Sequence, residues 1–153
     1  MRSNFLVIRF FIAFSFLALA LAACGPAKTP AAGTAVQFAN ACDKANNGKD
    51  VAVVGYLRFP ENFTGSTDVI LRLYATNNYD GAPVGVQIDF GTQANQVKAV
   101  TDQYSDSDLT IFLANGQPAP YGTKVKVSGY VYFPATSQDF ACGLETPFVE
   151  SAQ

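Results

Sequence analysis

The chain has 153 residues, a length typical of one domain, with a formal net charge of −2 and no histidine. The lack of histidine excludes histidine-based catalytic triads, histidine metal sites and histidine acid–base catalysis. The sequence also has no P-loop, no G-x-G-x-x-G motif and no C-x-x-C pair. No residue pattern therefore points to a nucleotide, zinc or redox site, and we expect neither a metal nor a cofactor.

The first 23 residues have the form of a signal peptide. Arg2 and Arg9 form a short basic stretch that precedes an apolar run over 10–21. This run is shorter than the roughly 20 residues that a transmembrane helix needs. The run ends in Leu21-Ala22-Ala23-Cys24, which resembles the lipobox of bacterial lipoproteins. The resemblance implies cleavage before Cys24 and a diacylglycerol on its thiol. The alternative is an ordinary A-x-A secretory cleavage, with the cysteine present by chance.

A lipoprotein of this kind would be anchored to the cell membrane or the outer membrane, with its domain outside the cytoplasm. Gly25 follows the cysteine. Many lipoproteins kept in the inner membrane of Gram-negative bacteria have Asp there, so Gly25 favours the outer membrane where one exists. Residues 24–33 are rich in Pro, Ala and Gly and predict a flexible tether, about 30 Å long when extended. We expect the folded domain over 34–153.

The net charge and the cysteines of the mature chain bear on its partners and on a disulfide. Without residues 1–23, eight Lys and Arg face twelve Asp and Glu, a net charge of −4. An acidic balance argues against general phosphate binding, so nucleic acid is not an expected partner. Cys42 and Cys142 remain once Cys24 is acylated, and an even pair in an oxidising compartment predicts a disulfide. The alternative is two free thiols.

The domain is expected to begin with a short helix. The apolar spacing from Thr34 to Asn46 allows one, with Thr34 as its N-cap. Residues 46–50 (NNGKD) are typical of a turn that leads into a strand.

One pattern occurs twice in the chain. Residues 51–60 (VAVVGYLRFP) and 125–134 (VKVSGYVYFP) both fit V-x-V-x-G-Y-x-x-F-P. Apolar residues or Gly at every second position predict a β-strand with one buried face. The central glycines, Gly55 and Gly129, predict a bend or bulge, and the closing proline ends the ladder.

Further alternation predicts strands over 69–76, 84–90, 109–113 and 143–150. Residues 96–100 fit either a short strand or one helical turn, and 117–122 are expected to form a Pro-rich loop. Pro147 confines the last strand to an edge or a bulge, because proline has no N–H to donate.

The predicted fold class is all-β, a small barrel of five or six strands. The segments GYL, LRLY and VQID, the strand GTKVKVSGYV and a closing strand after it resemble the OB fold. Within that fold, the chain is loosely similar to the tRNA anticodon-binding type, and the resemblance covers about 50–150. It implies that the first and fourth core strands pair to close the barrel, although the strand over 109–113 is an addition to the five-strand plan. An immunoglobulin-like sandwich is the alternative.

Two polar features are candidate sites. Asp102, Asp106 and Asp108 could hold Ca²⁺, but they lack the Gly and terminal Glu of an EF-hand, so a solvated loop is the simpler interpretation. The second is an outward face of Tyr and Arg side chains, residue types favoured at recognition surfaces. If the two repeat strands are neighbours, their outward residues should form one patch. The candidate face comprises Tyr56, Arg58, Arg72, Tyr74, Tyr130 and Tyr132.

Two simpler interpretations compete with a binding face. The tyrosines suit exposed strands by β-propensity alone, and Arg72 could pair with Asp89 across the sheet. The function expected is that of a lipid-anchored, non-catalytic OB-like module that binds another envelope protein and reaches the membrane through Cys24. The alternative is a binder of single-stranded nucleic acid or oligosaccharide, and an enzyme is not expected.

Overall fold

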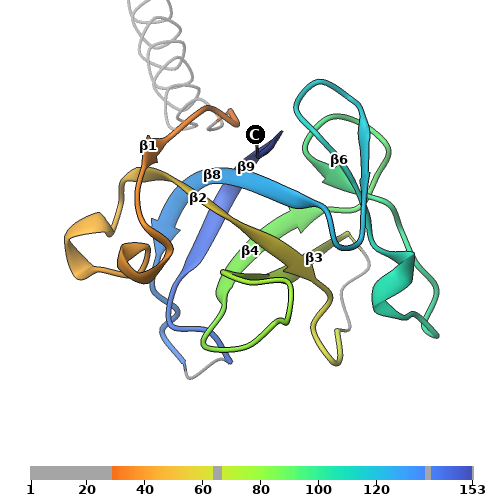
Figure 1. Cartoon of the computed structure of the whole chain (residues 1–153), viewed down its shortest axis with the longest axis horizontal. Helices are drawn as coiled ribbons and strands as arrows, with labels where there is room; N and C mark the ends of the chain where they lie inside the picture. The colour runs from red at the N-terminus through yellow and green to blue at the C-terminus, as the bar shows by residue number, and fades with distance from the viewer. Residues whose placement is uncertain (1–28, 64–66, 137–138, 153) are drawn as a thin grey trace, which may run out of the picture.

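The computed structural model describes residues 29–63, 67–136 and 139–152. The expected signal peptide, Cys24 and the first part of the tether lie outside these residues. Five long strands build the main body (Figure 1). They are β2 (Asp50–Arg58), β3 (Asp68–Tyr74), β4 (Val84–Asp89), β8 (Lys124–Tyr132) and β9 (Gly143–Ser151). The shorter strands are β1 (Thr34–Ala35), β5 (Gln96–Val97), β6 (Thr110–Phe112) and β7 (Pro118–Pro120).

The five long strands form a closed barrel. Their order is β2-β3-β4-β9-β8, and β8 pairs again with β2. All neighbours are antiparallel except β4 and β9, which are parallel. This is a small OB-like barrel, as the sequence predicts, and it is one closed sheet instead of the two facing sheets of a sandwich.

The two copies of the repeated pattern are the strands that close the barrel. In the antiparallel pair of β2 and β8, Val53 lies opposite Val127, and these valines hold equivalent places in the two copies. Alternate residues of all five strands face inward and are buried. Among them are Val53, Leu57, Leu71, Leu73, Val86, Ile88, Val127, Val131, Leu144 and Val149.

A bulge interrupts the pairing of β8 with β9 and accounts for Gly129 in β8 and Pro147 in β9. Tyr130 pairs with Glu145 but Ser128 pairs with Phe148, so β9 holds one extra residue there. The extra residue lets Leu144 and Val149, an odd number of positions apart, both point into the core. Pro147 lies inside this bulge, as predicted.

Both central glycines lie where a neighbouring strand approaches closely. A Cβ on Gly129 would lie 2.9 Å from the Leu144 Cβ and from the Glu145 carbonyl oxygen. A Cβ on Gly55 would overlap the Tyr74 carbonyl oxygen of β3. The predicted bulge is therefore at Gly129, whereas Gly55 allows β3 to approach β2.

The N-terminal segment differs from the expected helix. Thr34 is not an N-cap: it begins β1, which runs parallel to β2, with Thr34 opposite Val51 (Figure 1). Two 3-10 turns follow, Phe38–Asn40 and Lys44–Asn46. The local helical pattern is weak. The backbone groups of this segment therefore form hydrogen bonds with the exposed edge at the start of β2 instead of with one another. The predicted disulfide is present and ties this segment to the start of β9 through Cys42 and Cys142.

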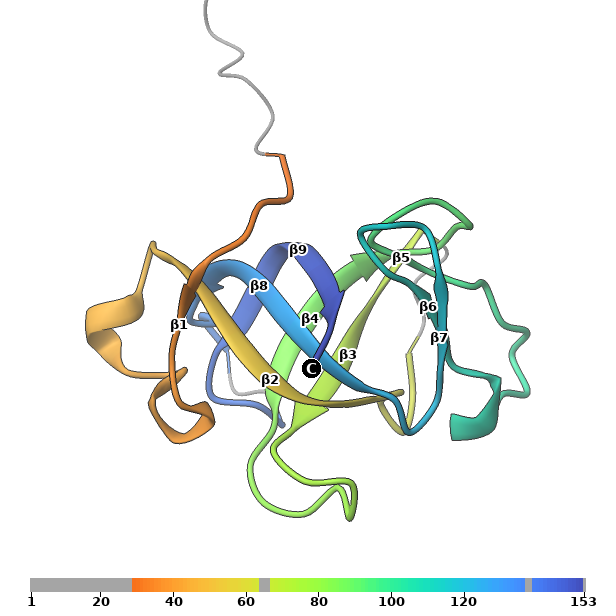
Figure 2. The same cartoon turned by 45° about the horizontal axis from the view of Figure 1, so that its top comes forward.

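The region between β4 and β8 forms a small second sheet beside the barrel, in the order β5-β6-β7 (Figure 2). The ambiguous residues 96–100 contain β5, and a 3-10 turn, Asp106–Asp108, precedes β6. Residues 118–120 are a strand and not the loop expected from their prolines. Among the described strands, β7 pairs only with β6, so the N–H groups that proline lacks interrupt no second hydrogen-bond ladder. The sheet packs Val97, Leu109, Ile111, Leu113 and Ala119 against the barrel core.

Within the described residues, no helix is long and apolar enough to cross a membrane.

Candidate functional site

One row of paired residues runs along the outside of the barrel. Arg58 of β2 lies opposite Arg72 of β3, Arg72 opposite Gly85 of β4, Gly85 opposite Gly143 of β9, and Gly143 opposite Tyr132 of β8. Paired residues point to the same side of a sheet. We call these five residues the outer row, and its two glycines leave room for aromatic rings.

Each glycine of the outer row is covered by a ring. A Cβ on Gly85 would lie 2.8 Å from two ring carbons of Phe140, and a Cβ on Gly143 would overlap the ring of Tyr132. The Phe140 ring also supports the Arg72 guanidinium, whose Cζ lies 4.7 Å from the ring centroid. This is a distance at which a cation is attracted to the face of the ring.

A groove lies beside this row, at the ends of β2 and β3. Its volume is about 510 Å³, and its walls include residues 59–62, which follow β2, and Asp139, which precedes β9. In OB folds the face of the second and third strands and the loops at these two positions commonly hold the ligand. The groove is lined by Arg58, Phe59, Pro60, Glu61, Asn62, Arg72, Tyr74 and Asp139.

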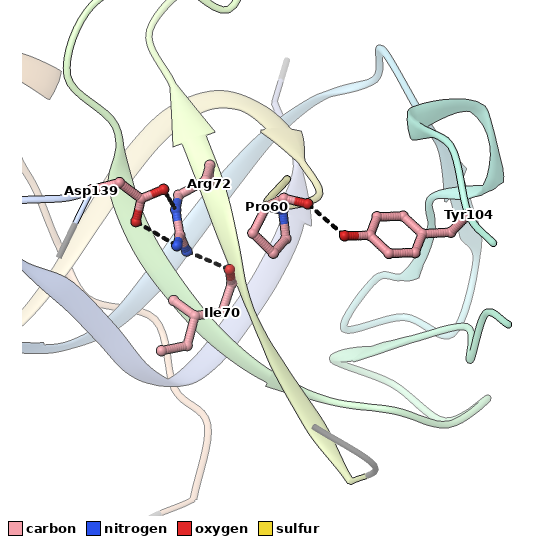
Figure 3. Close-up of polar contacts among 5 residues, drawn as sticks. All are labelled: Pro60, Ile70, Arg72, Tyr104 and Asp139. Atoms are coloured by element: carbon pink, nitrogen blue, oxygen red, sulfur yellow. Dashed lines mark hydrogen bonds and ion pairs between the residues drawn. The ribbon is translucent and has the colours of Figure 1, made fainter. Parts of the chain in front are cut away.

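Arg72 is the most buried charged group of the groove, and its partner is Asp139. Its Nε donates to Asp139 Oδ2 over 2.7 Å and its Nη2 donates to Oδ1, while Nη1 donates to the Ile70 carbonyl oxygen (Figure 3). The Arg72 hydrogen bonds lower the pKa of Asp139. The expected pair with Asp89 is wrong, because Asp89 lies opposite Asp68 and Arg72 lies opposite Gly85.

Arg58 pairs with a carboxylate of the 3-10 turn that precedes β6. Its Nε donates to Asp106 Oδ2 over 2.7 Å. The Arg58 guanidinium also lies over the Tyr79 ring, with Cζ 5.8 Å from the centroid. Both arginines that line the groove are therefore neutralised by carboxylates of the same chain.

A tyrosine cluster begins at Tyr74, which lines the groove, and continues over Tyr79 and Tyr121. The Tyr74 ring meets the edge of Tyr79 at 5.7 Å, and Tyr79 stacks on Tyr121 at 5.3 Å. Tyr56 lies opposite Tyr74 in the ladder between β2 and β3. Burial raises the pKa of Tyr79, and the neighbouring Tyr121 hydroxyl raises it further. The Tyr79 phenol therefore stays neutral at physiological pH.

Four aromatic rings pack together next to the groove wall formed by Phe59 and Pro60. Phe63 packs on Phe59 at 5.9 Å, on Phe90 at 5.6 Å and on Tyr104 at 4.8 Å between ring centroids. The Tyr104 hydroxyl donates to the Pro60 carbonyl oxygen over 2.8 Å (Figure 3). This bond fixes the loop that forms one wall of the groove.

The structure divides the predicted tyrosine–arginine patch in two. The repeat strands are neighbours, but they are antiparallel, so Tyr56 lies opposite Lys124 while Tyr130 lies opposite Asp50 at the far end of β2. Arg58, Arg72 and Tyr132 belong to the same outer row. The row connects β2 to β8 through β3, β4 and β9, and not through the direct pairing of β2 with β8. Tyr130 belongs to neither the row nor the groove.

Sequence reasoning missed Tyr79, Tyr121 and Asp139. Tyr79 lies in a turn with a positive φ of 56° and Asp139 lies in a loop, and periodicity gives no information on such positions. The glycines at 85 and 143 were visible in the sequence, but their role depends on the strand register.

Two members of the acidic cluster have structural contacts. Asp106 pairs with Arg58, and Asp108 accepts hydrogen bonds from the Ser105 hydroxyl and backbone N–H, which form a capping box. Across the part of the chain that the structure describes, no three His, Cys, Asp or Glu side chains are grouped as metal ligands would be.

Comparison with known proteins identifies no family. The scan of protein-family models gave no match to this chain, and the search of curated proteins gave no significant match.

Proposed function

We propose that the chain is an exported, lipid-anchored lipoprotein whose OB-like barrel is a non-catalytic module that binds another protein of the cell envelope. The groove lined by residues 59–62 after β2 and by Asp139 before β9 carries this proposal. It occupies the part of the barrel that OB folds use for ligands. Half-buried tyrosines and an arginine continue from it over the neighbouring surface, and these residue types are enriched at protein interfaces.

The charges of the groove favour a protein over single-stranded nucleic acid. A nucleic-acid groove needs unpaired cations along the phosphate backbone together with stacking rings. Here Arg58 and Arg72 are both paired with carboxylates, and Glu61 is exposed at the rim. An oligosaccharide is the alternative ligand, since a polar groove beside half-buried Tyr74 also suits sugar hydroxyls and ring faces.

The anchor rests on the lipobox. In cells, we expect Cys24→Ala to leave the protein unprocessed or soluble, because the thiol that would carry the lipid is gone. Labelling with a radioactive fatty acid, together with membrane fractionation, measures this. A Cys24→Ala protein that still fractionates with membranes at mature size would refute the lipoprotein proposal.

Capture of a partner tests the binding surface. The immobilised mature protein should retain an envelope protein from solubilised membranes, and retention should fall in a Tyr56→Ala/Tyr74→Ala double variant. Tyr130→Ala is the matched control, because Tyr130 lies at the opposite end of the β2–β8 pair. Equal retention by all three proteins would exclude this surface. Tight, salt-sensitive gel shifts with single-stranded DNA would favour the nucleic-acid alternative instead.

A further inference from the structure

We propose that the groove is a carboxylate-binding site built on Arg72, which Asp139 of the same chain occupies in this structure. A carboxylate of the partner protein would replace Asp139. This inference rests on the proposed function, because it names the chemical group by which the partner is held.

The contact between Arg72 and Asp139 has the geometry of ligand recognition. Two parallel N–H groups of the guanidinium, on Nε and Nη2, meet the two oxygens of one carboxylate. This planar fork is the most specific way in which a protein holds a carboxylate. Both residues line the groove, so a carboxylate that entered it and displaced Asp139 would reach these two donors.

The guanidinium is held in place by groups other than Asp139. Nη1 donates to the Ile70 carbonyl oxygen, and the Phe140 ring supports the plane of the group (Figure 3 shows the first contact). Phe140 is itself fixed, because its ring fills the space above Gly85 and the Gly85 N–H donates to the Cys142 carbonyl oxygen over 3.0 Å. Arg72 therefore keeps its position and its two free donors when Asp139 leaves.

The Asp139 side chain is largely exposed to solvent. It is 61% exposed, whereas that of Arg72 is 10% exposed. When an incoming carboxylate displaces Asp139, the released group is already largely hydrated and the two charge-assisted bonds of Arg72 are remade. The exchange leaves no buried charge unpaired, which would be the costly outcome. Tyr74 and the loop residues Glu61 and Asn62 line the rest of the groove, where they would contact the remainder of the partner.

The groove suits a carboxylate better than a phosphate. Its resident group is a carboxylate, and further negative charges lie close by at Glu61 and at Asp106 beside Arg58. A phosphate monoester carries about two charges at neutral pH and would be repelled more strongly than a single carboxylate.

The test is an NMR titration of the mature protein with benzoate, and with benzamide as its neutral isostere. Benzoate should move the Arg72 Nε–Hε resonance saturably in both wild type and Asp139→Asn, and benzamide should not. Binding should be about tenfold tighter in Asp139→Asn, because removing the internal competitor raises the fraction of the protein that is competent to bind. Phenyl phosphate should bind more weakly than benzoate.

Several outcomes would overturn the inference. An Arg72 resonance unmoved by benzoate in Asp139→Asn would do so, and so would equal movement by benzamide or tighter binding of phenyl phosphate. If Asp139→Asn does not fold, the titration of wild type at high benzoate decides by the same signal. Two short peptides then compete with benzoate, one ending in a free carboxylate and one amidated with an internal Asp. The peptide that competes shows whether the bound carboxylate is a chain terminus or an Asp side chain. If neither peptide competes, the assignment of the carboxylate to a protein partner is overturned.

Failure of this inference can be told apart from failure of the proposed function. An envelope protein that is retained equally with and without saturating benzoate would leave the binding module intact but reject the carboxylate. Benzoate binding at Arg72 without retention of any envelope protein would reject the protein partner but leave the site.

Discussion

Breaking the disulfide should be one of the most destabilising single chemical changes to this domain. The two cysteines are 100 positions apart, and in the chain-entropy model closing a loop of that length stabilises by about 4.7 kcal/mol at 25 °C. Removing native bridges from small secreted domains typically costs about 2–5 kcal/mol. At roughly 4 °C per kcal/mol for a domain of this size, the Tm should fall by about 8–20 °C.

Thermal unfolding followed by circular dichroism measures the effect in oxidised wild type, reduced wild type and Cys42→Ser/Cys142→Ser. Reduced wild type keeps both sulfur atoms, so its loss of stability reports the cross-link alone. Any further loss in the double variant reports the exchange of two sulfur atoms for hydroxyls, one at the partly buried position 42 and one at the fully buried position 142. Equal melting temperatures for oxidised and reduced wild type would refute the reasoning.

Three further predictions concern the core, the outer row and the groove. Val131 is fully buried, so Val131→Asp should abolish the cooperative unfolding transition by placing an unpaired charge in the core, whereas the control Val54→Asp, at a residue 40% exposed, should fold. Gly85→Ala should destabilise by about 1–3 kcal/mol in urea titrations because its Cβ meets the Phe140 ring, and unchanged stability would show that the ring yields freely. Asp139 has a lowered pKa, so the stability from its ion pair is present above its unfolded pKa near 3.8 and is lost as pH falls through the lower folded value. The stability difference between wild type and Asp139→Asn should therefore shrink below about pH 4, and a constant difference would contradict the pairing.

Residue alternation determined the barrel strands because burial on one face of a strand has a period of two. The repeated V-x-V-x-G-Y pattern located the two strands that close the barrel, and the even number of remaining cysteines predicted their bond. The helix expected from Thr34 was wrong for a physical reason: the local pattern is weak, and a free strand edge competed for the same backbone groups.

The candidate site was less accessible to sequence reasoning. Tyr56, Arg58, Arg72 and Tyr74 were assigned to an outward face, but the partner of Arg72 lies 67 residues away in a loop. No periodic signal connects such a pair, because the contact depends on where the fold brings the loop.

The direction and register of the strands decided which outward side chains lie together. The sequence shows that both repeat strands carry outward tyrosines, but only the antiparallel pairing shows that Tyr56 and Tyr130 lie at opposite ends. The outer row from Arg58 to Tyr132 needs four separate strand pairings to be known at once. The sequence by itself thus determined which residues face inward, since that is a local property of each strand. Only the tertiary structure decided which outward residues meet, since that depends on register and on loops that bring distant residues together.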